Sequence, residues 1–244
     1  MDTTLDHAAL DYFYAEGWIT QVLYLVKSGK EATVYCCEAR PSTGLGLVAA
    51  KLYRAREHRS FRNDAVYQAG RVILDGHARR AVKNKSRFGR EAQQGMWINH
   101  EWETLQALHA VGCDVPEPFA RTEGAILMGY RGDESASAPR LHELSLPPDE
   151  AHHAFEVLMR NVELFLANNV IHGDLSAYNV LYWQGAPTVI DFPQAVDPRF
   201  NPHAVALLER DVANLCGYFA RQGVRADAKA IVRDLWRRFL RAEL

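Results

Sequence analysis

The sequence predicts an α+β fold made of two lobes, a strand-rich first half and a helical second half. Short runs of β-branched and aromatic residues, separated by turns that contain Gly or Pro, fill much of the first part of the chain. Later stretches repeat apolar residues at helical spacing. We therefore expect one lobe from residues 1–130 and a second lobe from residues 131–244.

In the first lobe we expect one short helix, a small sheet and a longer helix. The short helix covers 6–16, and the longer one covers 93–111 and ends at Gly112. The stripe of the longer helix is formed by Trp97, His100 or Glu101, Leu105 and Leu108. The expected strands are 22–26, 32–37 and 46–53, followed by a closing hairpin of 117–121 and 125–130.

In the second lobe we expect a long helix that Asp149 caps and that ends near Asn169. Two short strands, 179–183 and 188–191, should follow a polar loop. Two further helices are expected, one opened by Pro202 and one over 226–242. The stripe of the first of these is Val205, Leu208, Leu215 and Phe219.

The amino-acid composition excludes few classes of function. The formal charge of −2 predicts no general affinity for nucleic acid. Four scattered cysteines without a C-x-x-C pair indicate a reducing compartment, so we expect a cytoplasmic protein. The acidic N-terminus is unlike a signal peptide, and no apolar run approaches the length of a membrane span, so no membrane partner is expected.

The basic residues are unevenly distributed. Residues 51–90 contain twelve of the 28 Lys and Arg residues but only three acidic residues, Glu57, Asp64 and Asp75. Two interpretations stay open. The segment is either a solvated insertion whose charges keep it in water or, over residues 54–90, a surface that binds RNA or another polyanion.

A polar motif carries most of the functional information. It runs from His172 to Asn179 and is followed by the sequence Val-Ile-Asp-Phe that ends at Phe192. Protein kinases place an Asp, an Asn and a second Asp at such spacing. Asp174 would accept the substrate proton, whereas Asn179 and Asp191 would hold Mg²⁺, or Mn²⁺, on the ATP phosphates. The alternative is a loop of ordinary turn residues.

The first lobe supplies residues for the rest of an ATP site. Lys51 ends a strand, as does the kinase Lys that contacts the α- and β-phosphates. Glu101 should pair with Lys51 because it lies on the apolar stripe of the long helix, and Glu103 is its rival. The full set expected to contact the nucleotide is Ser28, Lys30, Val34, Ala49, Lys51, Met128, Tyr130, Leu181 and Ile190.

Two departures from ordinary kinases point to a particular family. The phosphate-covering loop, Ser-Gly-Lys-Glu-Ala-Thr-Val over residues 28–34, has a single glycine, and Ser176 stands where most serine/threonine kinases have Lys. Further motifs are the hinge sequence over 128–141, the segments 172–181 and 189–194, and Glu-Arg-Asp-Val-Ala-Asn over 209–214. With these motifs the chain resembles the RIO family of atypical protein kinases. The Ala-Pro-Arg-Leu hinge resembles the first RIO subfamily, and Asp-Phe-Pro-Gln the second. We expect a compact, divergent, bacterial member close to the first subfamily.

The resemblance implies a minimal two-lobed kinase fold without an extended activation loop. Residues 1–130 would carry the ATP-covering loop and the basic insertion, and residues 131–244 the catalytic and metal-binding loops. It further implies γ-phosphate transfer to a protein Ser, to a Ser of the chain itself or to Asp191. The alternative is an ATPase that gates an assembly such as the ribosome, with RNA or a ribosomal particle as partner. A small-molecule phosphotransferase is a weaker alternative.

Two further polar residues are expected to have structural roles. Asp211 lies on the apolar face of its helix, and we favour it as an anchor for the backbone of the catalytic loop over a simple boundary residue. His172 is expected to be a packed scaffold residue, because Asp174 already occupies the position of the base.

Overall fold

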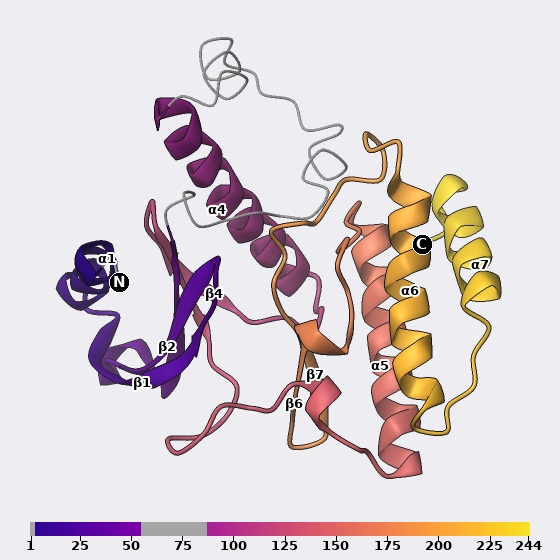
Figure 1. Cartoon of the computed structure of the whole chain (residues 1–244), viewed down its shortest axis with the longest axis horizontal. Coiled ribbons are helices and arrows are strands. Elements are labelled where there is room, and N and C mark those ends of the chain that lie inside the picture. The colour runs from indigo at the N-terminus through magenta and orange to yellow at the C-terminus, as the bar shows by residue number, and fades with distance from the viewer. Residues whose placement is uncertain (1–2, 55–86) are drawn as a thin grey trace. The chain divides into compact units, whose positions relative to one another are not determined.

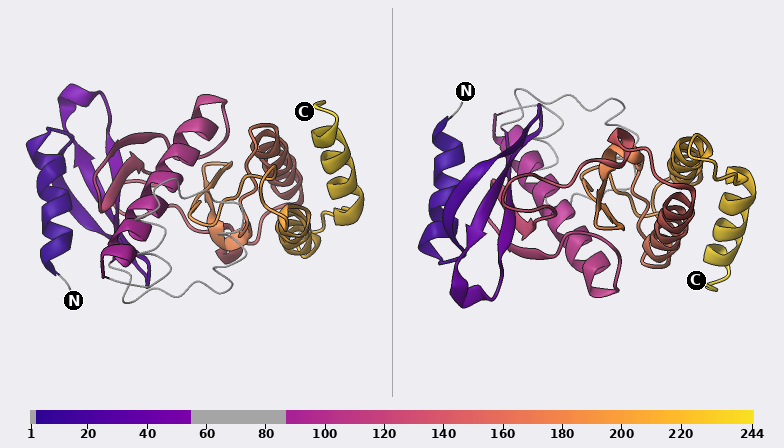
Figure 2. Two further views of the ribbon diagram at one scale, coloured as in Figure 1. Left: turned by 90° about the horizontal axis from the view of Figure 1, so that it is seen from above. Right: turned by 90° about the horizontal axis from the view of Figure 1, so that it is seen from below.

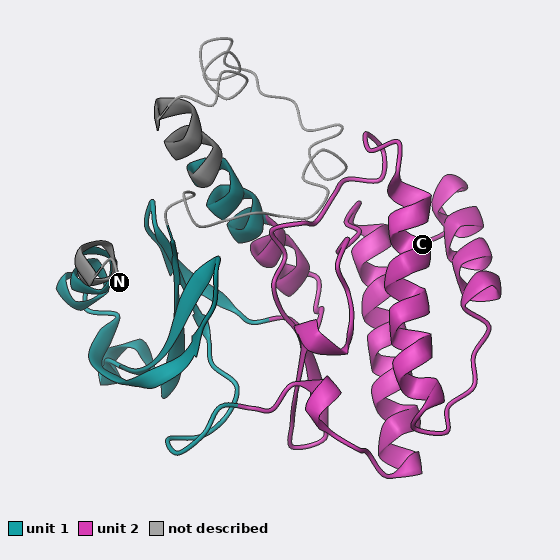
Figure 3. Cartoon of the chain, viewed as in Figure 1, with its two compact units in different colours: residues 1–61, 72–103, 116–137 teal, residues 62–71, 104–115, 138–244 magenta. Residues whose placement is uncertain are grey.

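The computed structural model describes residues 3–54 and 87–244 (Figure 1). Most of the basic segment, residues 55–86, therefore lies outside the described residues. The chain divides into two compact units (Figure 3). Among the described residues, unit 1 comprises 3–54, 87–103 and 116–137, and unit 2 comprises 104–115 and 138–244.

Unit 1 is built on a five-stranded antiparallel sheet with the strand order β1-β2-β3-β5-β4. The strands are β1 (Ile19–Ser28), β2 (Ala32–Ala39), β3 (Leu47–Tyr53), β4 (Pro118–Arg121) and β5 (Ala125–Gly129). The helix α1 (Thr3–Ala15) precedes the sheet, and a short 3₁₀ turn, η1 (Pro41–Thr43), joins β2 to β3. All the expected strands of this unit are present, and β1 is longer at both ends than predicted.

The two faces of this sheet differ in character. Val48, Ala50 and Leu52 alternate along β3 and are buried in one apolar core with Phe13 of α1 and Ile19 of β1. Residues of odd number in β3 face the other way because side chains alternate along a strand. The second face is therefore not part of that core, and it carries Lys51.

The helix α4 (Arg87–Ala110) starts six residues before the predicted position. Its first turns show no apolar period, which is why the sequence pattern missed them. The predicted stripe is confirmed, since Trp97, Glu101, Leu105 and Leu108 are all at most 9% exposed. Gly112 follows the helix at φ 78° and donates its N–H to the carbonyl of His109, as expected of a glycine that ends a helix.

Unit 2 combines three long helices with a short hairpin. The helices are α5 (Pro148–Ala167), α6 (Ala204–Ala220) and α7 (Ala228–Leu240), and the hairpin is β6 (Val180–Trp183) with β7 (Ala186–Val189). The 3₁₀ turn η3 (Leu141–Glu143) precedes α5, and the 3₁₀ turn η4 (Ala177–Asn179) precedes β6. Figure 2 shows α5 and α6 side by side, with α7 packed outside them.

Three sequence predictions in unit 2 were wrong in detail. Asp149 does not cap α5; Pro147 is the cap and Pro148 the first helical residue, because proline lacks the N–H that this position leaves unused. The helix α6 is capped by His203, so Pro202 lies just before it. Val205 is 37% exposed, because Ala204 and Leu207 provide the buried face in the first turn.

No helix among residues 3–54 and 87–244 is long and apolar enough to cross a membrane.

A buried amide joins the segment after α4 to α5. Asn161 is 1% exposed, and its Oδ1 accepts a hydrogen bond of 2.7 Å from the N–H of Asp114. Its Nδ2 donates to Asp114 Oδ2 at 2.7 Å and to the carbonyl of Val157 at 2.8 Å. The backbone of Asp114 in turn accepts from the N–H of Val189, so this contact positions the end of β7.

Replacing Asn161 by Leu should lower the free energy of unfolding by about 1–3 kcal/mol, because the N–H and carboxylate of Asp114 lose their partners. The measurement is urea unfolding, with a lower midpoint and an unchanged slope. Glu156→Leu, at an exposed position of the same helix, is the control and should change stability by less than about 0.5 kcal/mol. Equal midpoints for the two variants would show that the amide contributes nothing specific.

Candidate functional site

In unit 1, a strand lysine is paired with a buried carboxylate. Lys51 Nζ lies 2.7 Å from Glu101 Oε1, and the Tyr53 hydroxyl donates to Glu101 Oε2 at 2.5 Å. Glu101 is 1% exposed, whereas Glu103 is exposed, so the partner expected from the helical stripe is confirmed. Both oxygens of the buried carboxylate are thus hydrogen-bonded, as burial requires.

Strand register places the predicted nucleotide contacts of the sheet on one face. Val34 pairs directly with Lys51, and Ala49 pairs with Met128. Ala49 and Lys51 are two residues apart on β3, so all four side chains share a face. This is the face opposite the core formed with α1. It presents small and apolar side chains beside one ammonium group.

Ser28 ends β1 and Lys30 lies in the turn that leads to β2, and both residues are exposed. Arg54, directly after β3, holds this turn: its N–H donates to the carbonyl of Glu31 at 2.9 Å and its Nη2 donates to Ser28 Oγ at 2.5 Å. Sequence reasoning counted Arg54 with the basic segment and missed this role. No local pattern could have found it, because the contact joins the end of one strand to a distant turn.

A second polar cluster fixes the chain after β5. The hydroxyls of Tyr24 and Tyr130 are 2.5 Å apart, and Tyr24 also donates to the carbonyl of Asp133 at 3.0 Å. Burial raises the pKa of both tyrosines. Gly132 has φ 137°, and a Cβ there would lie 2.4 Å from the carbonyl oxygen of Ala136. The segment that follows Met128 is therefore a tightly closed turn in which only glycine fits at position 132.

In unit 2, Asp174 and Asn179 are joined by a side-chain amide. Asn179 Nδ2 donates to the carbonyl of Asp174 at 2.9 Å and to its Oδ2 at 3.3 Å. Burial raises the pKa of Asp174 above its ordinary 3.8; the nearby charge of Asp191 also raises it, and Arg210 lowers it. The raised pKa brings this carboxylate closer to the neutral range in which a general base is most effective.

His172 connects the catalytic loop to the segment after β7. Its Nδ1 accepts from the N–H of Asp174 at 3.3 Å, so Nε2 carries the proton and donates to the carbonyl of Ile190 at 3.1 Å. The ring is 1% exposed and lies 4.7 Å from the ring of Phe192. The scaffold role expected of His172 is confirmed.

The hairpin brings the two expected metal ligands to one end. Asn179 precedes β6 and Asp191 follows β7, and the pairing of Val180 with Val189 makes these ends neighbours. β7 ends at Val189, two residues before the predicted end, and Asp191 has φ 76°. The N–H of Ile190 donates to the carbonyl of Asn179 at 2.9 Å.

These residues fit Mg²⁺ bound to phosphates. The Nδ2 of Asn179 is used by Asp174, so its carbonyl oxygen is the end left to act as a ligand, together with the carboxylate of Asp191. Mg²⁺ prefers such hard oxygen ligands and takes the others from phosphate and water. In the described part of the chain, no group of three or more His, Cys, Asp or Glu residues could hold a metal by itself.

The catalytic loop is anchored by Asp211 of α6. Its Oδ2 accepts from the N–H of Gly173 at 2.7 Å and its Oδ1 from the N–H of Leu175 at 2.9 Å. One helical turn later, Asn214 Nδ2 donates to the carbonyl of Leu175 at 3.0 Å. Asp211 is 2% exposed, and the anchor role expected from its position on the apolar face is confirmed.

The remaining predicted nucleotide contacts, Leu181 and Ile190, are residues of unit 2. The other seven, together with Glu101, belong to unit 1. The structure thus brings together Lys51 with Glu101 in one unit, and Asp174, Asn179 and Asp191 in the other.

The chain matches the RIO domain family model over residues 33–231. It belongs to the RIO domain family. The Rio1 serine/threonine-protein kinase of Schizosaccharomyces pombe is 29% identical over 208 residues, which cover 84% of this chain and 39% of that protein. The Rio1 protein of Thermoplasma acidophilum is 28% identical over 192 residues, 79% of this chain and 95% of that protein. Both are Rio1 proteins, in line with the expected subfamily.

The fold comparison agrees with the minimal kinase-like α+β fold expected from the sequence. The Rio2 kinase of Chaetomium thermophilum, solved as an ADP/Mg²⁺-phosphoaspartate complex, has a TM-score of 0.68 and 23% identity. The match covers 94% of this chain and 66% of that one. The chain spans about two fifths of the length of the S. pombe relative. The bacterial source stays a prediction.

Replacing Asp211 by Asn should destabilise the fold, because an amide has one oxygen and its NH₂ would face one of the two backbone donors. The effect should also depend on pH. Burial raises the pKa of Asp211 from 3.8 to about 7, so over that interval the folded chain holds a proton that the unfolded chain has released. The free energy of unfolding of the native chain should therefore fall as pH rises from 3.8 to about 7.

The amide introduced by Asp211→Asn does not titrate, so the stability advantage of the native chain over this variant should shrink as pH rises through the same interval. Urea unfolding of both chains near the two ends of the interval measures the difference. An advantage that grows with pH would contradict the prediction, because it would mean that the buried carboxylate is ionised throughout.

Proposed function

We propose that the chain is an ATP- and Mg²⁺-dependent RIO-type protein kinase that transfers the γ-phosphate to a Ser of a protein acceptor or of the chain itself. The observation that carries this proposal is the amide of Asn179, which holds Asp174 while Asp191 lies at the same end of the hairpin. Membership of the RIO domain family supports it, as do the kinase names of the relatives.

In this proposal, unit 1 holds the nucleotide. Lys51 contacts the α- and β-phosphates, and Glu101 with Tyr53 keeps its side chain in place. Ser28 and Lys30 contribute donors in place of the missing glycines. Unit 1 supplies apolar contacts from Val34, Ala49, Met128 and Tyr130, and the sequence adds Leu181 and Ile190 of unit 2.

Unit 2 performs the proton transfer. Bound Mg²⁺ would neutralise charge on the transferring phosphate, held by Asn179 and Asp191. Asp174 accepts the proton of the acceptor hydroxyl, and its raised pKa suits that task. Asn179 and His172 fix the carboxylate and the backbone of Asp174, so that the base is oriented before the acceptor arrives.

A second function, ATP hydrolysis through a phosphorylated aspartate, is favoured by the short link after the metal loop. Only residues 192–203 separate Asp191 from α6, which leaves little room for a segment that docks a peptide. The Chaetomium Rio2 structure contains phosphoaspartate. Asp191 would here be the acceptor, and water would then release the phosphate. Such a chain would act as a nucleotide-gated assembly factor.

The partners and location belong to the same proposal. An unidentified protein acceptor, and RNA or a ribosomal particle bound through residues 54–90, are supported by the sequence alone. Residues 55–86 of that surface lie outside the described residues. The cytoplasmic location rests on the cysteine pattern.

Incubation with γ-labelled ATP and Mg²⁺, with and without cell lysate, tests both functions. Asp174→Ala should slow turnover about 10²–10⁴-fold and leave ATP affinity nearly unchanged, because a general base contacts the acceptor. Asp191→Ala should abolish turnover. Label on Ser survives acid and hydroxylamine, whereas label on Asp191 is lost to hydroxylamine. Asp149→Ala, which removes an exposed carboxylate of α5, is the control. Normal turnover in Asp191→Ala would contradict both proposed functions.

Lys51 and Glu101 should act as one unit in nucleotide binding. Lys51→Ala and Glu101→Ala should each weaken ATP binding, and the double variant should lose little more than Lys51→Ala alone, because the carboxylate acts through the ammonium. Titration of ATP against the three variants gives the cycle. Glu103→Ala, at an exposed acid of the same helix, should bind ATP normally. Additive losses would mean that Glu101 does not act through Lys51.

A further inference from the structure

The catalytic loop carries one exposed aromatic side chain, Tyr178. It is 59% exposed, although Ala177 and Asn179 on either side of it are buried. The contacts proposed for the nucleotide, the metal and the proton transfer do not include it. A single exposed ring is common on protein surfaces and carries no argument by itself. The stacking of this ring, its position and the charge around it together indicate a binding role.

One face of the Tyr178 ring is covered by an imidazole. The rings of His142 and Tyr178 are stacked, with their centroids 4.0 Å apart and their planes at 30°. His142 belongs to η3, and its Nδ1 is buried without a hydrogen-bond partner among the described residues, so packing holds the ring. The exposed area of Tyr178 therefore lies on the ring face and edges that the imidazole does not cover. We call the two stacked rings the aromatic platform.

Both halves of the aromatic platform are anchored. Tyr218 of α6 is 4% exposed, and its hydroxyl donates to the carbonyl of Leu141 at 2.7 Å, which fixes η3. In η4, Ser176 Oγ accepts the N–H of Tyr178 at 3.4 Å, and the Ser176 carbonyl accepts the N–H of Asn179 at 2.9 Å. A surface that is already ordered loses little freedom when it binds a ligand, which favours binding.

The aromatic platform lies within reach of an acceptor bound at Asp174. Asn179 directly follows Tyr178, and its Nδ2 donates to Asp174 Oδ2 at 3.3 Å. An acceptor hydroxyl must approach that carboxylate to give up its proton. An extended peptide rises about 3.3 Å per residue, so a side chain roughly two to four residues from the acceptor serine can reach the ring of Tyr178.

The sequence around the aromatic platform is acidic. Residues 141–198 contain eight Asp or Glu residues and a single basic residue, Arg160. Glu143 borders the platform, because its Oε1 lies 3.9 Å from Nε2 of His142, and its side chain is 52% exposed. In the catalytic loop, the neutral Ser176 stands where most serine/threonine kinases have a Lys. An incoming cation would therefore meet carboxylates and little opposing charge.

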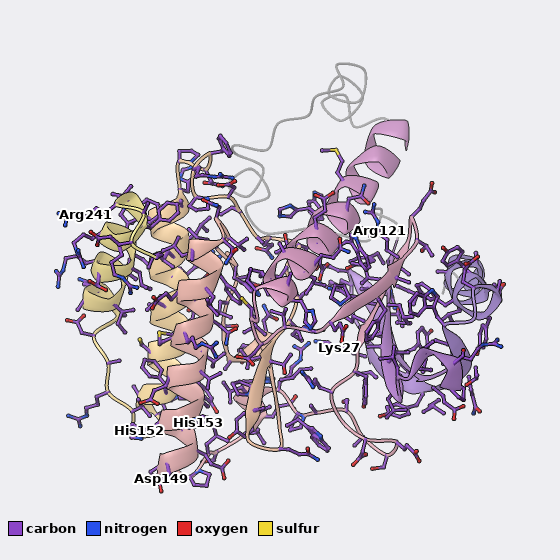
Figure 4. All side chains as sticks on the ribbon, turned by 180° about the vertical axis from the view of Figure 1, so that it is seen from behind. Lys27, Arg121, Asp149, His152, His153 and Arg241 are labelled. Carbon is purple, nitrogen blue, oxygen red and sulfur yellow. The ribbon has the colours of Figure 1, made fainter. Side chains whose placement is uncertain are left out.

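The basic residues of unit 2 leave this negative charge largely in place. Residues 138–220 contain four of them, Arg140, Arg160, Arg199 and Arg210. Arg199 pairs with Asp197 at 2.6 Å, and Arg140 and Arg210 are half-buried. The other seven lie in residues 221–244, and Arg241 among them is labelled in Figure 4. Figures 1 and 2 show α7 on the far side of α5 and α6 from the β6–β7 hairpin.

We propose that the aromatic platform binds a basic residue, Arg or Lys, of the acceptor segment close to the serine that receives the phosphate. A cation over the face of a tyrosine ring is attracted by its π-electrons, and the flat guanidinium of Arg also stacks on it. The carboxylate of Glu143 adds attraction for the same charge. A nucleic-acid base would stack too, but it would bring its phosphates into an acidic region. The inference rests on the proposed kinase function, since it names the class of acceptor for that site.

The test uses the full-length chain and a set of serine peptides. Each peptide has one serine in a background of Ala and Gly and one Arg, placed at positions up to about four residues before or after the serine. A matched peptide carries citrulline instead of Arg, which has a similar shape without the charge. The ratio of kcat/KM for the two peptides is measured for the native chain and for each variant. Because the ratio is internal to each variant, a general loss of activity does not change it.

The native chain should favour the Arg peptide about fivefold at one or two positions, mainly through a lower KM. Tyr178→Phe keeps the ring and should keep the ratio, whereas Tyr178→Leu should bring it close to one. Glu143→Gln keeps an oxygen for the N–H of Arg140 and should lower the ratio in part. Tyr12→Leu, at a tyrosine that is 44% exposed, and Glu156→Gln, at an exposed acid of α5, are the matched controls and should keep the native ratio. Circular dichroism melting checks that each variant folds.

Binding is measured separately from turnover, by fluorescence anisotropy of the labelled peptides with Mg²⁺ and an ATP analogue that cannot be hydrolysed. Phosphorylation without a preference for Arg, or a preference that survives Tyr178→Leu, would overturn the inference and leave the kinase proposal standing. Binding of the Arg peptide that depends on Tyr178, without phosphorylation of any peptide, would support the platform and contradict transfer to a protein acceptor. If no peptide is bound or phosphorylated, the inference fails, and label on the chain itself decides the kinase proposal.

Discussion

One buried carboxylate sets the geometry of the catalytic loop. Asp211 accepts the N–H groups of Gly173 and Leu175, the two neighbours of Asp174, so the base is fixed on both sides by a residue of α6. Gly173 has φ 79°, a conformation that side chains disfavour, and this turn lets both N–H groups point at one carboxylate. The position of Asp174 therefore depends on the packing of α6, and the apolar core of unit 2 becomes part of the site.

Each of three buried polar groups near the site is satisfied by more than one hydrogen bond. The carboxylate of Glu101 accepts hydrogen bonds from Lys51 and Tyr53, and the amide of Asn161 binds both the backbone N–H and the carboxylate of Asp114. Both ring nitrogens of His172 are hydrogen-bonded to the backbone. Fully satisfied networks are rigid, whereas a missing partner leaves a costly buried group. The candidate site is consequently built from elements that hold its side chains in place before any nucleotide binds.

Sequence reasoning found the polar residues that lie on amphipathic stripes. Glu101 and Asp211 occur at helical spacing among apolar residues, so their burial and their need for a partner could be predicted. Arg54 and the pair of Tyr24 with Tyr130 could not be predicted, because their hydrogen bonds join residues that lie far apart in the chain and that no local pattern connects. The cap of α5 was misassigned because Asp149 and Pro148 are both good residues for a helix start.

Asp191 combines a strained backbone conformation with the role proposed for its carboxylate. It is a non-glycine residue at φ 76°, a conformation that persists only when the surroundings determine it. They do so here: Ile190 before it is bound by Asn179 and His172, and Phe192 after it is fully buried against Phe165 and His172. Glycine would relieve the strain but would provide no carboxylate. A strained backbone retained at an aspartate is what a site needs when that carboxylate must face a metal ion or accept a phosphate, and both proposed functions require it.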